Sequence, residues 1–92
     1  MQIDHFLSEL SKFHDEFECD ISPAGRAEKL HEEIMEYLLE ECGNDRYAKV
    51  DEATDMLVCV IAYLISEGVS DPLYAAWAKL CKTAVKYRLA AL

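Results

Sequence analysis

Apolar residues recur at three- and four-residue spacing near the start of the chain, which predicts a helix over residues 3–18. The apolar positions of this segment are Ile3, Phe6, Leu7, Leu10, Phe13 and Phe17. Charged residues and two histidines, His5 and His14, occupy the other side. The pattern is typical of a helix that packs by one face, and a lid or a substrate contact is the alternative.

A capping residue followed by proline marks the start of a second helix. Ser22 is a suitable N-cap and Pro23 suits the first helical position, so we predict a helix from Pro23 to about Cys42, ended by Gly43-Asn44. Its apolar stripe is Ala27, Leu30, Ile34, Tyr37 and Leu38. The same logic at Ser70-Asp71-Pro72 predicts a fourth helix that carries the apolar residues from Leu73 to Tyr87.

A third helix is predicted from Asn44 or Asp45 to Glu67, with Gly68 at its end. Its apolar residues cover more than half of the helix circumference and are Val50, Ala53, Met56, Leu57, Val60, Ile61, Leu64 and Ile65. The remaining narrow strip is Glu52, Asp55, Cys59, Ala62 and Ser66. A helix this apolar is normally buried, and one small protomer cannot bury it alone, so we expect self-association.

These elements predict one all-α domain over residues 1–92: a four-helix up-down bundle, completed by oligomerisation as a homodimer or homotetramer. The composition supports helices, since 52% of the residues are hydrophobic and there are only three glycines and two prolines.

The charge distribution and the cysteine spacing limit the expected partners and cellular compartment. Residues 1–71 hold all 18 acidic and five of the nine basic residues, a net charge of −13, whereas residues 72–92 carry +4. The total of −9 makes nucleic acid an unexpected partner.

Four cysteines without a C-x-x-C pair suggest reduced thiols and a cytoplasmic protein. The polar start does not resemble a signal peptide, and the apolar run from 56 to 65 is too short for a membrane span.

Two pairs of carboxylates suggest a metal site. Glu33 and Glu36 share one face of the second predicted helix, and Glu52 and Asp55 share one face of the third. If these helices pack antiparallel, the four carboxylates meet, and a cation must offset their repulsion. Asp55 also directly precedes the apolar run, where an unpaired charge is costly to bury. Oxygen ligands suit Mg²⁺, with Mn²⁺ or Ca²⁺ possible. The alternative is a solvated acidic face.

The spacing Glu33-x-x-Glu36, fifteen residues, Glu52-x-x-Asp55 resembles the signature of the all-α nucleoside triphosphate pyrophosphohydrolases, the MazG-like superfamily. The flanking segments 29–36 and 51–57 resemble its two metal helices, and the basic end of the chain resembles that of many members. The resemblance implies Mg²⁺-dependent cleavage between the α- and β-phosphates, in dimers or tetramers whose sites often span protomers.

Residue roles follow from that resemblance. The metal ligands would be Glu33, Glu36, Glu52 and Asp55. The catalytic candidates are Glu32, Glu33 and Glu36, of which Glu32 could orient or deprotonate the attacking water, as could Glu40. The candidates for holding substrate phosphates are Lys82, Lys86 and Arg88. A helix-dipole or surface role is the alternative for these bases.

Other functions remain open at this point. Phosphoribosyl-ATP pyrophosphohydrolase resembles the second and third predicted helices almost as well. A di-iron bundle needs two Glu-x-x-His motifs, and the chain offers one candidate, Glu28-x-x-His31. A non-catalytic acidic helical interaction module could keep the fold without activity. The complete set of four carboxylates favours the hydrolase.

Overall fold

The computed structural model describes residues 3–92, and these residues form four helices. The helices are α1 (Ile3–Glu16), α2 (Pro23–Glu41), α3 (Arg46–Ser66) and α4 (Pro72–Ala90). The predicted all-α class is confirmed, and the first helix ends two residues earlier than predicted. Met1 and Gln2, part of the polar start considered above, lie outside the described residues. Among residues 3–92, no helix combines the length and apolar character needed to cross a membrane.

Each of the three later helices begins with a side-chain cap at a predicted position. Ser22 Oγ accepts a hydrogen bond of 3.1 Å from the N–H of Gly25, directly before Pro23. Asp45 Oδ1 accepts a hydrogen bond of 3.1 Å from the N–H of Ala48, and Asp71 Oδ1 accepts one of 3.0 Å from the N–H of Tyr74. Each cap satisfies a backbone donor that the helix leaves unpaired and contributes about 1 kcal/mol.

The end of α3 is fixed by a glycine in the left-handed region. Gly68 has φ of +89°, and its N–H bonds to the carbonyl of Ile65 at 2.9 Å. The N–H of Val69 reaches the carbonyl of Leu64 at 3.0 Å. This pair of bonds is the Schellman arrangement, which turns the chain sharply out of the helix and toward α4.

Helix α1 ends with the same pair of backbone hydrogen bonds as α3, but a glutamate takes the place of the glycine. Glu18 has φ of +50°, its N–H reaches the carbonyl of Asp15 at 3.4 Å, and the N–H of Cys19 reaches that of His14 at 3.0 Å. A residue with a Cβ is strained in this conformation. The chain then turns back into α2.

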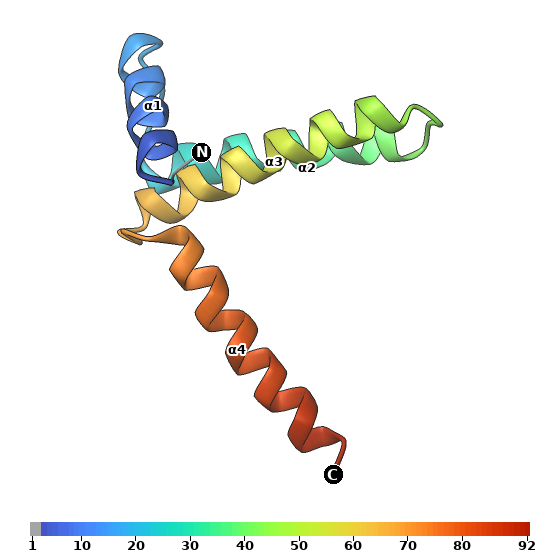
Figure 1. Ribbon diagram of the computed structural model, residues 1–92. Coiled ribbons are helices and arrows are strands. Elements are labelled where there is room, and N and C mark those ends of the chain that lie inside the picture. Colours follow the sequence, from blue (N-terminus) through green and yellow to red (C-terminus); the bar gives the residue numbers. More distant parts are fainter. Residues whose placement is uncertain (1–2) are drawn as a thin grey trace.

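The helices α2 and α3 form a long antiparallel hairpin, with α1 across the end that holds the start of α2 (Figure 1). The last helix, α4, leaves the same end of the hairpin and projects away from it (Figure 1). One chain therefore forms a two-helix hairpin with two attached helices, and the bundle arrangement stays a prediction about the assembly.

One chain is too open to be a complete globule. Its radius of gyration is 15.7 Å, whereas a compact chain of this length has about 12 Å. It exposes 7301 Å², whereas a compact protein of this mass exposes about 5,400 Å². Within the described residues, the buried apolar side chains are Ala62, at 4% exposure, and Pro72.

The narrow strip of α3 faces α2, and much of the broad apolar face is exposed, although its residues Met56, Ile61 and Leu64 are half-buried. Ala62 of the strip is buried and Glu52 is half-buried, whereas Val50 and Leu57 are 54% and 58% exposed. The sequence correctly predicted an apolar surface larger than one chain can bury. It follows that any burial of this surface comes from a partner.

Candidate metal centre

The hairpin brings three of the four predicted ligands together. Glu33 and Glu36 lie one turn apart on α2, and Glu52 approaches them from α3. One carboxylate oxygen from each of the three lies within 4.8 Å of the others. The antiparallel packing of α2 and α3 brings Glu52 to the pair on α2, but the four carboxylates that were predicted to meet do not form a single group.

The fourth predicted ligand, Asp55, belongs to a second group that shares Glu52. This group consists of Asp51, Glu52 and Asp55, again with oxygens within 4.8 Å of one another. Glu52 therefore connects the two groups into one patch of five carboxylates. The sequence analysis did not assign Asp51 a role, although its position one helical turn before Asp55 was the available signal.

Two oxygens at the centre of this patch lack a partner. Glu33 is 6% exposed, and its Oε2 is buried without a hydrogen bond. Glu52 Oε2 is also buried without a partner. A buried, unpaired carboxylate oxygen is costly, and a hard cation is the ligand that would satisfy several such oxygens at once. The donor set therefore fits a divalent metal ion.

The charges of the patch act on Glu52 in particular. Burial raises the pKa of Glu52 above its ordinary value, and the surrounding negative charges raise it further. These charges belong to Glu36, Asp55, Glu33 and Asp51. A cation bound at the patch would reverse this effect, because it favours the ionised carboxylate.

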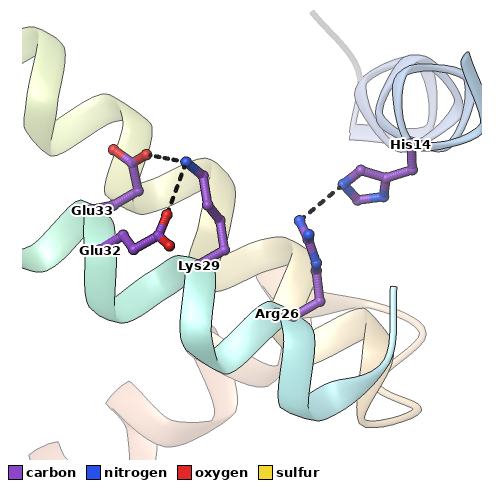
Figure 2. Close-up of polar contacts among 5 residues, drawn as sticks. All are labelled: His14, Arg26, Lys29, Glu32 and Glu33. Atoms are coloured by element: carbon purple, nitrogen blue, oxygen red, sulfur yellow. Dashed lines mark hydrogen bonds and ion pairs between the residues drawn. The ribbon is translucent and has the colours of Figure 1, made fainter. Parts of the chain in front are cut away.

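Lys29 supplies the positive charge nearest to the inner carboxylate. Its Nζ lies 3.0 Å from Glu33 Oε1 and 3.5 Å from Glu32 Oε2, as Figure 2 shows. The bond to Glu33 is the main cause that raises the pKa of Lys29, so the ammonium stays charged. Glu32 itself is exposed and belongs to neither carboxylate group.

A cavity of about 310 Å³ opens beside the patch, between α1 and the hairpin. Glu33 and Asp55 contribute acidic groups to its wall, and Arg26 and Lys29 contribute basic ones. The rest of the lining is mainly apolar, with residues from α1 and α3. The cavity is within the size range of small-molecule sites and carries the mixture of apolar and charged groups typical of them.

A second cavity, of about 330 Å³, adjoins the first and shares His14 and Arg26 with it. These two side chains meet across the gap between α1 and α2, with 3.5 Å between His14 Nε2 and Arg26 Nη1 (Figure 2). Burial lowers the pKa of His14, and the charge of Arg26 lowers it further, while Asp15 opposes the shift. The neutral imidazole is therefore favoured here.

The predicted phosphate-binding residues lie far from the carboxylates within one chain. Lys82 and Lys86 share a shallow depression on α4, and α4 projects away from the hairpin (Figure 1). Arg88, two residues after Lys86, lies about 200° farther round the helix. One chain thus leaves these three bases away from the metal patch and divides them between two faces of α4.

The di-iron alternative gains no support from the described residues. Glu28 and His31 are both exposed, and neither belongs to the carboxylate groups found among residues 3–92. The patch itself contains carboxylates only, which suits a hard cation better than the mixed histidine and carboxylate set of a di-iron bundle.

Comparison with known proteins gave no match: no family model, no curated protein and no solved structure matches this chain. The resemblance to the MazG-like superfamily therefore rests on the residues quoted above.

Proposed function

We propose that this protein is a Mg²⁺-dependent nucleoside triphosphate pyrophosphohydrolase, which converts an NTP or dNTP to the monophosphate and pyrophosphate. The observation that carries the proposal is the pair of buried, unpartnered oxygens of Glu33 and Glu52, one from each helix of the hairpin. Together with Glu36 these two residues form a group whose carboxylate oxygens lie within 4.8 Å of one another, and a cation would offset their repulsion.

The residues have separate roles in this proposal. The cation would be held by Glu33, Glu36, Glu52 and Asp55. Bound Mg²⁺ would neutralise the phosphate charge that develops during cleavage and help to activate water. Glu32 is exposed one residue from the buried Glu33, so it can reach a water molecule and accept its proton. Glu33 and Glu36 keep their catalytic assignment because they would hold the cation that helps to activate this water.

The adjoining cavities offer room for the substrate. Arg26 and Lys29 present positive charge on the wall that also carries Glu33 and Asp55, which suits a phosphate chain bridged to a cation. The apolar lining farther along suits a base and sugar. The two adjoining spaces, of about 310 and 330 Å³, are each within the size range of small-molecule sites.

Assembly as a homodimer or homotetramer completes the fold in this proposal. One chain exposes about 1,900 Å² more than a compact protein of its mass, which is within the range that each subunit of an obligate dimer buries. The acidic body and the basic α4 also complement each other between copies. In the assembled bundle, Lys82, Lys86 and Arg88 of one copy would reach phosphates at another copy's patch.

The four cysteines are unpaired in the structure. Free thiols of this kind suit a reducing compartment, and we therefore assign the protein to the cytoplasm.

Product analysis by ³¹P NMR tests the proposed reaction. With Mg²⁺ and a nucleoside triphosphate, we expect the α-phosphate signal of a monophosphate together with pyrophosphate. A diphosphate and inorganic phosphate would instead show cleavage between the β- and γ-phosphates and would contradict the proposal. Phosphoribosyl-ATP belongs in the same assay, because the chain also resembles the hydrolases that act on it.

A non-catalytic interaction module is the second candidate, and the exposed apolar surface favours it. Tyr47, Leu39 and Trp77 are 82%, 75% and 59% exposed, which is unusual for a protein that acts alone. Both candidates predict assembly, so turnover separates them. A protein that binds Mg²⁺ without hydrolysing any triphosphate would be the interaction module.

A further inference from the structure

The ion pair between Lys29 and Glu33 joins a half-exposed base to a buried acid. The side chain of Lys29 is 43% exposed and that of Glu33 is 8% exposed, and Nζ lies 3.0 Å from Oε1. The same ammonium lies 3.5 Å from the exposed Glu32. Lys29 therefore reaches inward from the edge of α2 to the innermost carboxylate of the metal patch.

Helix stability alone does not account for this pair. The matching pair of Lys12 and Glu9 on α1 has side chains that are 71% and 53% exposed, and such surface pairs contribute little. On a helix, a lysine that precedes its glutamate by one turn is also in the less favourable order. What distinguishes the Lys29 pair is the burial of its acid within the carboxylate patch.

The two oxygens of Glu33 have different surroundings as a result. Oε1 is occupied by Lys29, whereas Oε2 is buried and has no hydrogen-bond partner. Figure 2 shows one oxygen directed at Lys29 and the other directed away from it. The unpartnered oxygen belongs to a side chain more than nine-tenths buried, and this is the observation that points to a ligand.

We propose that Lys29 is a positioning residue that occupies Glu33 Oε1, so that Glu33 can offer a cation only one oxygen, and that it thereby makes the site prefer Mg²⁺ over Ca²⁺. The inference rests on the metal patch of the proposed function. Mg²⁺ takes six oxygens in a tight octahedron and uses single carboxylate oxygens, whereas Ca²⁺ takes six to eight and often binds both oxygens of one carboxylate. Removing Lys29 releases the second oxygen and favours the larger ion.

Metal affinity of the purified protein tests this directly, without reference to turnover. Titration calorimetry gives the dissociation constants of Mg²⁺ and Ca²⁺ for the wild type and for Lys29→Met. Loss of one positive charge strengthens the binding of both ions, so the informative quantity is the ratio of the two dissociation constants. We expect Ca²⁺ to gain about tenfold over Mg²⁺ in Lys29→Met, through the added carboxylate oxygen. Lys12→Met is the matched control, with the same loss of charge and of an ion pair, and should keep the wild-type ratio.

The outcomes separate this inference from the proposed function. If the wild type binds neither ion, the metal patch is wrong and the role of Lys29 falls with it. If the wild type binds Mg²⁺ but Lys29→Met keeps the same ratio, the metal patch stands and the role of Lys29 is wrong.

Infrared difference spectra of the wild type provide a test that does not depend on the folding of Lys29→Met. The carboxylate bands that shift when Ca²⁺ is added, and that vanish in Glu33→Gln, report how Glu33 binds. The wide band separation of a single-oxygen ligand is expected. The narrow separation of two-oxygen binding would overturn the inference.

Discussion

Glu33 of α2 and Glu52 of α3 lie together across the hairpin, and each keeps its Oε2 buried without a hydrogen-bond partner. The two acids come from segments that are separate in sequence and joined only by the antiparallel packing of their helices. Their juxtaposition costs free energy in the absence of a cation, and this cost has consequences for both activity and stability.

Loss of a single carboxylate of the patch should abolish turnover. We expect Glu33→Gln and Asp55→Ala to lower the rate of pyrophosphate release by about a hundredfold or more, because each removes charge that holds the cation. Helical content by circular dichroism should survive. Glu41→Gln, a change at an exposed acid outside both groups, is the control and should keep its rate. A fully active Asp55→Ala would show that the site is misplaced.

Neutralising Glu52 should stabilise the protein when no cation is present. The raised pKa of Glu52 means that its ionised form is disfavoured in the folded state, so Glu52→Gln removes a repulsion near neutral pH. Mg²⁺ should raise the melting temperature of the wild type and have a smaller effect on this variant. Thermal unfolding with Mg²⁺ and with EDTA measures both effects. Equal stabilisation of the two proteins by Mg²⁺ would contradict the assignment of Glu52 as a ligand.

The contact between His14 and Arg26 predicts that stability depends on pH. The pKa of His14 lies below its ordinary value of 6.5, chiefly through burial and then through Arg26. The imidazole of His14 therefore binds a proton more readily in the unfolded chain than in the folded protein. The stabilisation that the neutral His14 gives the folded state is complete above pH 6.5 and is lost as the pH falls through the folded-state pKa. Urea unfolding between about pH 8 and 5 should show a shallower decline for His14→Gln. The exposed His31 supplies the control, since His31→Gln should follow the wild type.

The apolar face of α4 should be the place where assembly is most sensitive. Leu73, Trp77 and Leu80 are each more than half exposed and lie on one side of the helix. Trp77→Ala should raise the dissociation constant of the oligomer by about tenfold or more. Trp77 is the only tryptophan of the chain, so its emission should shift to shorter wavelength as the wild type assembles. A monomer at micromolar concentration by light scattering would refute self-association.

The strained end of α1 offers a stabilising substitution. Glu18 holds φ of +50° with both Schellman hydrogen bonds in place, a position that glycine occupies without strain. Glu18→Gly should therefore stabilise the protein by about 1 kcal/mol. The converse change at the end of α3, Gly68→Ala, should destabilise by a similar amount, since Gly68 has φ of +89°. Urea unfolding compares both, and destabilisation by Glu18→Gly would show that the glutamate makes a contact of its own.

The sequence predicted the elements well because their ends are set locally. Ser22, Asp45 and Asp71 cap the helices that follow them, and Gly68 ends α3 through its own backbone conformation. The carboxylate patch was predictable for a related reason. Three-residue spacing fixes the face of a helix, and the short turn at 42–45 fixes the antiparallel pairing.

Features that depend on contacts between distant segments could not be predicted. Nothing in the spacing shows that Lys29 lies closer to Glu33 than to Glu32, or that Glu33 is buried while Glu36 is exposed. The meeting of His14 with Arg26 depends on how α1 lies across the hairpin. The direction of α4 could not be predicted either, because its apolar side chains Leu73, Trp77 and Leu80 stay exposed in one chain and do not fix it against the hairpin.

Pyrophosphate release from a panel of ribo- and deoxyribonucleoside triphosphates, with Mg²⁺ or with EDTA, tests the central claim most directly. The account predicts release with a monophosphate product when Mg²⁺ is present and none when EDTA removes it, and the preferred base would define the substrate. No release from any triphosphate, with phosphoribosyl-ATP included in the panel, would contradict the hydrolase and leave the interaction module as the function.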